Sequence, residues 1–260
     1  MRCRAVSHDL TYPTHRANRK TTWSKMMRHF FFALLVLMFA AESLSAQIRR
    51  PPRVYTTNDP DWWVSAGVGG FRGNGVNDGV TGSSWDFGNA TNLQYRASLE
   101  KAMDNGASFG FAGSYARVPF TYSADLAKPL PVGENGTRCL SCNAHLDMTT
   151  LVLGFHSGSG NGFHQIVELN GGVVMYKNLK EDAGGAKLAP SKGNIDPLFS
   201  LAYGFGYGFS TRMALDLIFA DYTFAIHERK GLANGTSNTN SMPSLRVALR
   251  MGFGSHTITR

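Results

Sequence analysis

The spacing of eight alternating segments constrains this 260-residue chain more than any other feature. In each segment apolar and non-apolar residues alternate, which is the pattern of a β-strand with two different faces. The segments cover residues 62–72, 92–103, 107–118, 145–156, 163–176, 198–209, 212–224 and 244–253. The seven connections between them contain 19, 3, 26, 6, 21, 2 and 19 residues, so long and short connections alternate throughout. Because an up-and-down antiparallel barrel places every second connection at the same end, the sequence predicts an all-β, eight-stranded antiparallel up-and-down barrel.

The composition of the two faces indicates which one points outward. Opposite the apolar face of most segments stand Gly, Ala and Ser, as in the run 198–209. Small residues suit the narrow interior of a small barrel, whereas a water-facing wall needs charge, and only 17% of this chain is charged. We therefore expect the apolar face to contact lipid, with aromatic residues forming interfacial girdles. The alternative is a soluble periplasmic calyx whose apolar face lines a ligand cavity.

Three residues depart from this alternation. Lys101 and Arg117 fall on the apolar face, but each lies near a strand end, where a long side chain can extend to the interface. Asp221 shares the parity of the apolar residues before it in segment 212–224. We expect either a β-bulge near Ala220 or an exit from the membrane at that point.

The N-terminal region reads as a targeting segment. Residues 30–41 (FFFALLVLMFAA) follow basic residues and precede small ones, as in a secretory signal peptide, and these twelve are too few to span a bilayer as a helix. We expect a cleaved extension and signal peptide over 1–46, a Pro-rich periplasmic linker over 47–61 and the barrel over 62–260. Met26 or Met27, rather than Met1, would be an ordinary start for such a signal. Losing 1–46 lowers the net charge from +8 to +3, so charge gives little support to nucleic-acid binding.

The final segment, SLRVALRMGF, carries a resemblance to a known group. Together with the Gly-rich aromatic strands, it makes residues 62–253 similar to the small eight-stranded outer-membrane β-barrels of the OmpA transmembrane-domain, OmpX and OmpW kind. The resemblance implies a bacterial outer-membrane location, contact with outer-membrane lipid and recognition of the last strand by the barrel-assembly machinery. Seven residues follow Phe253 here, beyond the usual aromatic end of that signal. The apolar residues of the predicted signal are Leu245, Val247, Leu249, Met251 and Phe253.

Several charged or titratable residues fall on the small-residue face and therefore inside the predicted barrel. Because an unpaired buried charge costs several kcal/mol, each needs a partner. We expect a salt-bridge network that fills the lumen, with Arg250 bridging two acids. The alternative is a polar constriction in a narrow pore. The predicted network consists of Arg96, Glu100, His164, Glu168, Asp216, Arg246 and Arg250.

Cys139 and Cys142 lie in the long connection 119–144. In an exported chain the pair predicts a disulfide, because the compartment is oxidising. Cys-x-x-Cys with the nearby His145 also suggests zinc, but a tetrahedral site would lack its fourth ligand. We therefore expect no metal and no cofactor.

A pair of the hydrolase type is suggested by His156 with the following serines. Its spacing does not match a His-x-Ser pair, and the segment boundaries place His156 beside a turn at the periplasmic end. A polar residue flanking a turn is the simpler interpretation.

The predicted function is non-enzymatic: a structural or surface-interaction barrel whose external loops meet an unidentified partner. These loops are residues 73–91, 119–144, 177–197 and 225–243. The alternatives are a narrow channel for small or apolar solutes, a lipid-modifying barrel enzyme and the periplasmic calyx.

Overall fold

A computed structural model describes the barrel and the residues that enter it. The described residues are 59–78, 82–88, 90–103, 106–124, 132–133, 136, 138–226 and 239–255. The predicted signal peptide, the candidate start residues and linker residues 47–58 lie outside them.

The described part of the chain consists almost entirely of β-strands, eight of which form the barrel wall. The wall strands are β1 (Trp62–Phe71), β4 (Asn92–Ala102), β5 (Ala107–Ala124), β6 (Ser141–Ser157), β7 (Gly162–Glu181), β8 (Asn194–Ser210), β9 (Met213–Ile226) and β10 (Thr239–Phe253). Two short strands, β2 (Val76–Asp78) and β3 (Ser83–Asp86), form a hairpin within the first long connection, where only a loop was expected.

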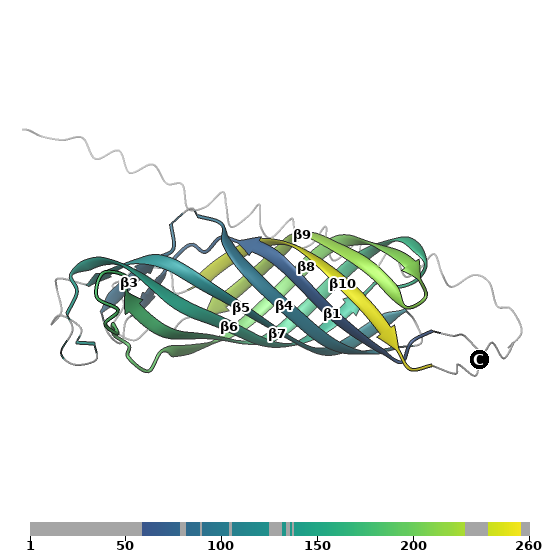
Figure 1. Cartoon of the computed structure of the whole chain (residues 1–260), viewed down its shortest axis with the longest axis horizontal. Coiled ribbons are helices and arrows are strands. Elements are labelled where there is room, and N and C mark those ends of the chain that lie inside the picture. The colour runs from purple at the N-terminus through teal and green to yellow at the C-terminus, as the bar shows by residue number, and fades with distance from the viewer. Residues whose placement is uncertain are drawn as a thin grey trace, which may run out of the picture. The chain divides into compact units, whose positions relative to one another are not determined.

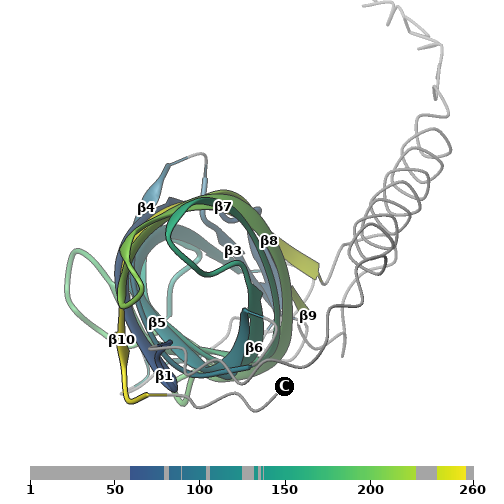
Figure 2. The ribbon, with the colours of Figure 1, turned by 90° about the vertical axis from the view of Figure 1, so that its right-hand side faces the viewer.

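The wall closes because its first and last strands pair with each other. Each strand pairs antiparallel with the next along the chain, and β1 pairs with both β4 and β10. Figure 1 shows the tilted strands, and Figure 2 shows the closed ring end-on. The predicted eight-stranded antiparallel up-and-down barrel is confirmed. No helix in the described residues is long and apolar enough to cross a membrane.

The outer surface of the barrel is apolar over most of its height. Side chains such as Phe111, Leu151 and Leu245 point outward and are 51–60% exposed. On the opposite face of β8, Ser200 and Ala202 are buried. The alternating apolar face of these strands points outward, so it does not line a ligand cavity, and this surface is suited to lipid. The predicted assignment of the two faces is therefore correct.

Several wall strands are longer than expected and reverse their pattern toward the end that carries the long connections, here called the loop end. In β5, Phe111 and Tyr115 point outward and are 60% and 44% exposed. Farther along, Val118, Phe120 and Tyr122 point inward and are at most 5% exposed. Strands of 17 to 20 residues exceed the roughly 9–11 that cross a bilayer. The predicted strand ends were wrong here because the search followed an outward apolar face, which ends where lipid ends.

A β-bulge in β9 explains the unusual parity of Asp221. Tyr203 of β8 lies opposite Ala220, but the next residue, Gly204, lies opposite Ile218, so Phe219 is an extra residue. The bulge turns Asp221 into the lumen, where it is 7% exposed. The predicted bulge near Ala220 is confirmed.

Candidate functional site

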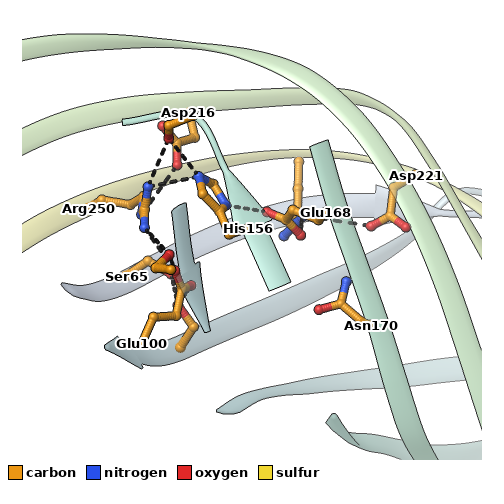
Figure 3. Close-up of polar contacts among 12 residues, drawn as sticks. Ser65, Glu100, His156, Glu168, Asn170, Asp216, Asp221 and Arg250 are labelled. Carbon is orange, nitrogen blue, oxygen red and sulfur yellow. Dashed lines mark hydrogen bonds and ion pairs between the residues drawn. The ribbon is translucent and has the colours of Figure 1, made fainter. Parts of the chain in front are cut away.

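The lumen is the candidate site because it collects many of the buried polar side chains, and Arg250 contacts several of them (Figure 3). Its guanidinium donates to Glu100 at 2.8 Å and lies 3.7 Å from Asp216, so it stands between two acids. It also donates to Ser108 at 3.0 Å and lies 4.7 Å from the ring centre of Trp63. Arg250 is 1% exposed, so its charge is balanced almost entirely by protein groups.

A second group of ion pairs surrounds Glu168, farther toward the loop end. Arg246 donates to Glu168, and Arg96 lies 3.8 Å from the same carboxylate. Arg246 also faces Asp221 at 3.6 Å, a contact that depends on the bulge in β9. Asn170 accepts a hydrogen bond from Arg96 at 3.3 Å. Sequence parity alone placed Asp221 with the outward residues, so its membership in this group could not be read from the pattern.

His156 links the two groups, a role not predicted from the sequence. Its Nδ1 lies 3.1 Å from Glu168, and its Nε2 lies 2.8 Å from Arg250. The same Nε2 lies 3.1 Å from the Gly158 carbonyl oxygen, so it sits between a donor and an acceptor. His156 lies next to the last residue of β6, beside the short turn as expected, but its side chain is buried in the lumen. His156 is an even number of positions from the inward Val152 on the same strand, and this alternation could have predicted its inward direction.

His164 is the member of the predicted set that stands apart. Its Nδ1 faces the Gly162 carbonyl at 3.2 Å, and its Nε2 is buried without a hydrogen-bond partner in the structure. Asp216 has a partnerless oxygen beside it, and a Cβ added at Gly206 would collide with both groups. Gly206 therefore leaves the space that the two side chains occupy.

The charged layer, as we call this network, is negative by count. Three arginines face four carboxylates. The hydroxyls of Ser98 and Ser108 donate to Glu100 at 2.6 Å and 2.5 Å. The network holds these charges in fixed places, and its residues come from β4, β6, β7, β9 and β10. The layer consists of Arg96, Glu100, His156, Glu168, Asp216, Asp221, Arg246 and Arg250.

An apolar core fills the lumen between the charged layer and the loop end. Trp85 of the β2–β3 hairpin is fully buried there, with its ring 5.7 Å from that of Tyr176 and 6.4 Å from that of Phe120. Leu146 and Leu188 are also buried in this outer core. A few polar groups are included and bonded, such as Asn240, whose amide contacts the Tyr176 hydroxyl at 3.5 Å.

Two small cavities lie among the lumen side chains, of about 20 Å³ and about 10 Å³. The cavity of about 20 Å³ separates the charged layer from the outer core, with Arg96, Asp221 and Thr150 in its lining. That volume holds about one water molecule. At the opposite end, a pocket of about 250 Å³ lies beside Pro60 and Trp63. The outer core and the charged layer lie between this pocket and the loop end.

The remaining predicted residues lie outside the charged layer, although Cys139 is buried in the outer core and Cys142 packs against that core. Cys139 and Cys142 are joined by a disulfide. His145, considered as a zinc ligand, contacts Arg117 and Asp182 at 2.6 Å each. The apolar residues of the predicted assembly signal point outward from β10, from 38% exposed at Leu249 to 51% at Leu245; they are Leu245, Val247, Leu249, Met251 and Phe253.

The hydrolase alternative finds no support in the contacts of His156. A base for a serine nucleophile needs a free ring nitrogen within hydrogen-bond reach of the hydroxyl. The Nε2 of His156 is engaged by Arg250, and Ser159 donates to the Gly106 carbonyl at 2.7 Å. Neither side chain is therefore arranged as a base paired with a serine nucleophile.

Comparisons with known proteins return structures but no families. No protein-family model and no curated protein matches the chain. Among solved structures, neisserial surface protein A is 12% identical, with a TM-score of 0.45 over 76% of this chain and 100% of its own. Ail, the attachment invasion locus protein of Yersinia pestis, is 9% identical, with a TM-score of 0.40 over 75% of this chain and 99% of its own. OprG of Pseudomonas aeruginosa is 11% identical, with a TM-score of 0.38 over 78% of this chain and 98% of its own. These likenesses concern the fold alone, and the eight-stranded transmembrane barrel stands on this chain's own strand pairing and apolar exterior.

Proposed function

We propose that this protein is a bacterial outer-membrane barrel with a non-enzymatic structural or surface-interaction role, exerted through the loop end on the cell surface. Outer-membrane barrels have short periplasmic turns and long external loops. By that rule the connections after β5, β7 and β9 are external, and the turns after β4, β6 and β8 are periplasmic.

The observation that carries the proposal is the filling of the lumen. A conducting pore needs a continuous polar path, and here the outer core closes the loop end with Trp85, Tyr176 and their neighbours. The charged layer closes the lumen a second time, with Arg250 and Arg246 pairing across it. Two independent fillings favour a static barrel over the alternative of a narrow channel.

The projecting part of the wall supports a surface role. The loop-end portions of β5, β6 and β7 have a polar outer face and an apolar inner face, as in a water-soluble domain. The long connections are therefore held on a packed support rather than at the lipid surface. A rigid support for variable loops is a common arrangement in binding proteins.

The first experiment tests location and topology together. Single cysteines replace Lys192, in the connection after β7, or Arg212, in the turn after β8, in a Cys139→Ser/Cys142→Ser background. A membrane-impermeant maleimide should label the Lys192→Cys protein in intact cells and the Arg212→Cys protein only after disruption. The purified protein should also change its electrophoretic mobility on boiling in SDS. Labelling at Arg212→Cys in intact cells, or fractionation without detergent, would overturn the proposed topology.

The second experiment separates the surface role from the channel. Planar bilayers containing the protein should show no conductance above that of bilayers treated with detergent alone. Steady single-channel steps from the wild-type protein would make the channel the better function.

A further inference from the structure

A hydrogen-bonded polar cluster lies on the outer surface of the barrel, on three neighbouring strands. Its members point outward at the positions where β5, β6 and β7 leave the apolar band. Tyr115 donates to Asp147 at 2.9 Å, and Asn178 donates to the same carboxylate at 2.7 Å. Arg117 donates to His145 at 2.6 Å, and the other ring nitrogen of His145 contacts Asp182 at 2.6 Å.

Two lysines extend the cluster, and their ammonium groups are not used within it. Lys177 lies across from Asp147, and Lys180 lies across from His145. Among the described residues, neither lysine side chain forms a hydrogen bond or an ion pair. Arg117 has five N–H donors and spends one on His145. The carboxylates are engaged, whereas most of the cationic donors point away from the barrel.

The cluster occupies only one side of the barrel. Toward the loop ends of β8 and β9 the outward residues are Ile195 and Ile226, which are 62% and 54% exposed. Below the cluster, Leu151 and Phe111 continue the apolar band. A molecule that fits this side must therefore be apolar beside the band and anionic directly above it.

We propose that this surface, formed by Arg117, Lys177 and Lys180 above the apolar band, binds the phosphorylated headgroup of an outer-leaflet glycolipid. The arginine fork suits phosphate oxygens, and the lysines act as point charges nearby. Tyr115 lies at the boundary, where interfacial aromatic residues are favoured. This inference rests on the proposed function in placing the loop end at the outer leaflet.

The test compares two forms of one lipid on the full-length mature protein in dodecyl maltoside. Diphosphoryl lipid A should raise the midpoint of the heat-induced mobility change more than monophosphoryl lipid A. The variant Arg117→Gln/Lys177→Gln/Lys180→Gln should bind diphosphoryl lipid A about 10- to 100-fold more weakly, since each surface cation contributes about 1 kcal/mol near anionic lipid. The matched control Lys101→Gln/Arg212→Gln removes cations from the opposite end and should bind as the wild type does.

Two further arms keep the result interpretable. Lys177→Gln/Lys180→Gln leaves the Arg117–His145 hydrogen bond intact, so its weaker binding would not reflect lost folding. Inorganic phosphate alone should give no stabilisation, and an equal effect would replace the lipid by a free-phosphate site. Wild-type affinity in the triple variant, or an equal loss in the control, would overturn the proposal. The measurement is made in micelles, so it can fail or succeed independently of the surface-labelling experiment.

Discussion

The two halves of this barrel distribute apolar and polar side chains in opposite ways between the outer surface and the lumen. Toward the short turns, apolar side chains such as Leu249 face lipid, and Arg250 is buried in the lumen. Toward the loops, Arg117 faces outward, and Phe120 is buried in the lumen. The long strands β5, β6 and β7 therefore face lipid along one part of their length and water along the other. Burial of apolar surface is driven by water, so it organises only the half that leaves the bilayer.

The difference also means that the two halves are held together by different forces. The charged layer is stabilised by ion pairs, and removing an arginine that serves two carboxylates leaves buried charges unpaired. The outer core is stabilised by packing, as in a soluble domain. Substitutions in the two halves should therefore reduce stability in different ways.

The largest effect should come from Arg250→Met. It leaves Glu100 and Asp216 without their main partner in a layer that already has an excess of carboxylates. We expect the free energy of unfolding to fall by about 3–5 kcal/mol. Denaturant titration of the protein in phosphatidylcholine vesicles measures it. Arg212→Met, at an exposed turn, is the control, and equal costs for the two substitutions would contradict a tightly coupled layer.

Trp85→Ala should produce the next largest effect, confined to the loop half. Removing a fully buried tryptophan costs about 3 kcal/mol. The β2–β3 hairpin joins the wall through the end of β5, so it should open while the membrane half stays closed. Protease should cleave the hairpin faster, with the mobility difference on boiling unchanged, and Trp85→Phe should behave nearly as the wild type. Loss of the mobility difference would show that the halves are not separable.

The disulfide should matter less. Cys139 and Cys142 are three positions apart, so their bond restricts a very short loop, worth about 2 kcal/mol at most in the chain-entropy view. We expect Cys139→Ser/Cys142→Ser to loosen the loop half only, seen as faster proteolysis there at an unchanged unfolding midpoint of the membrane half. A drop in that midpoint would mean that the disulfide supports the whole barrel.

Asp221→Asn should have the smallest effect and the most informative one. The Arg246–Asp221 contact is 3.6 Å, and Arg246 keeps its bond to Glu168. Removing one carboxylate also equalises the charges of the layer, so we expect a change of no more than about 1 kcal/mol. The same vesicle titration checks it. A loss as large as that for Arg250→Met would show that the negative excess is part of the design of the layer.

The alternation of residues along each strand predicted most of the charged lumen residues, and the two residues that it missed have identifiable causes. Glu100, Arg246 and Arg250 alternate with apolar residues, which places them inside any barrel whose apolar face is outside. His156 was missed because it ends its predicted segment and was interpreted as a residue flanking the turn, although the strand reaches Ser157 and the side chain faces the lumen. Asp221 was missed because a bulge changes parity, although the sequence did signal an irregularity there.

The sequence by itself determined the eight strands, their antiparallel order and the face that meets lipid, because a period-two pattern and alternating connection lengths are local properties of the chain. Only the tertiary structure decided that the loop half has an apolar core, since Val118 and Phe120 become interior residues only after the wall leaves the bilayer. It also decided which charges meet. Arg250 and His156 are 94 residues apart in the chain, and the closure of the wall and the stagger of its strands bring them together.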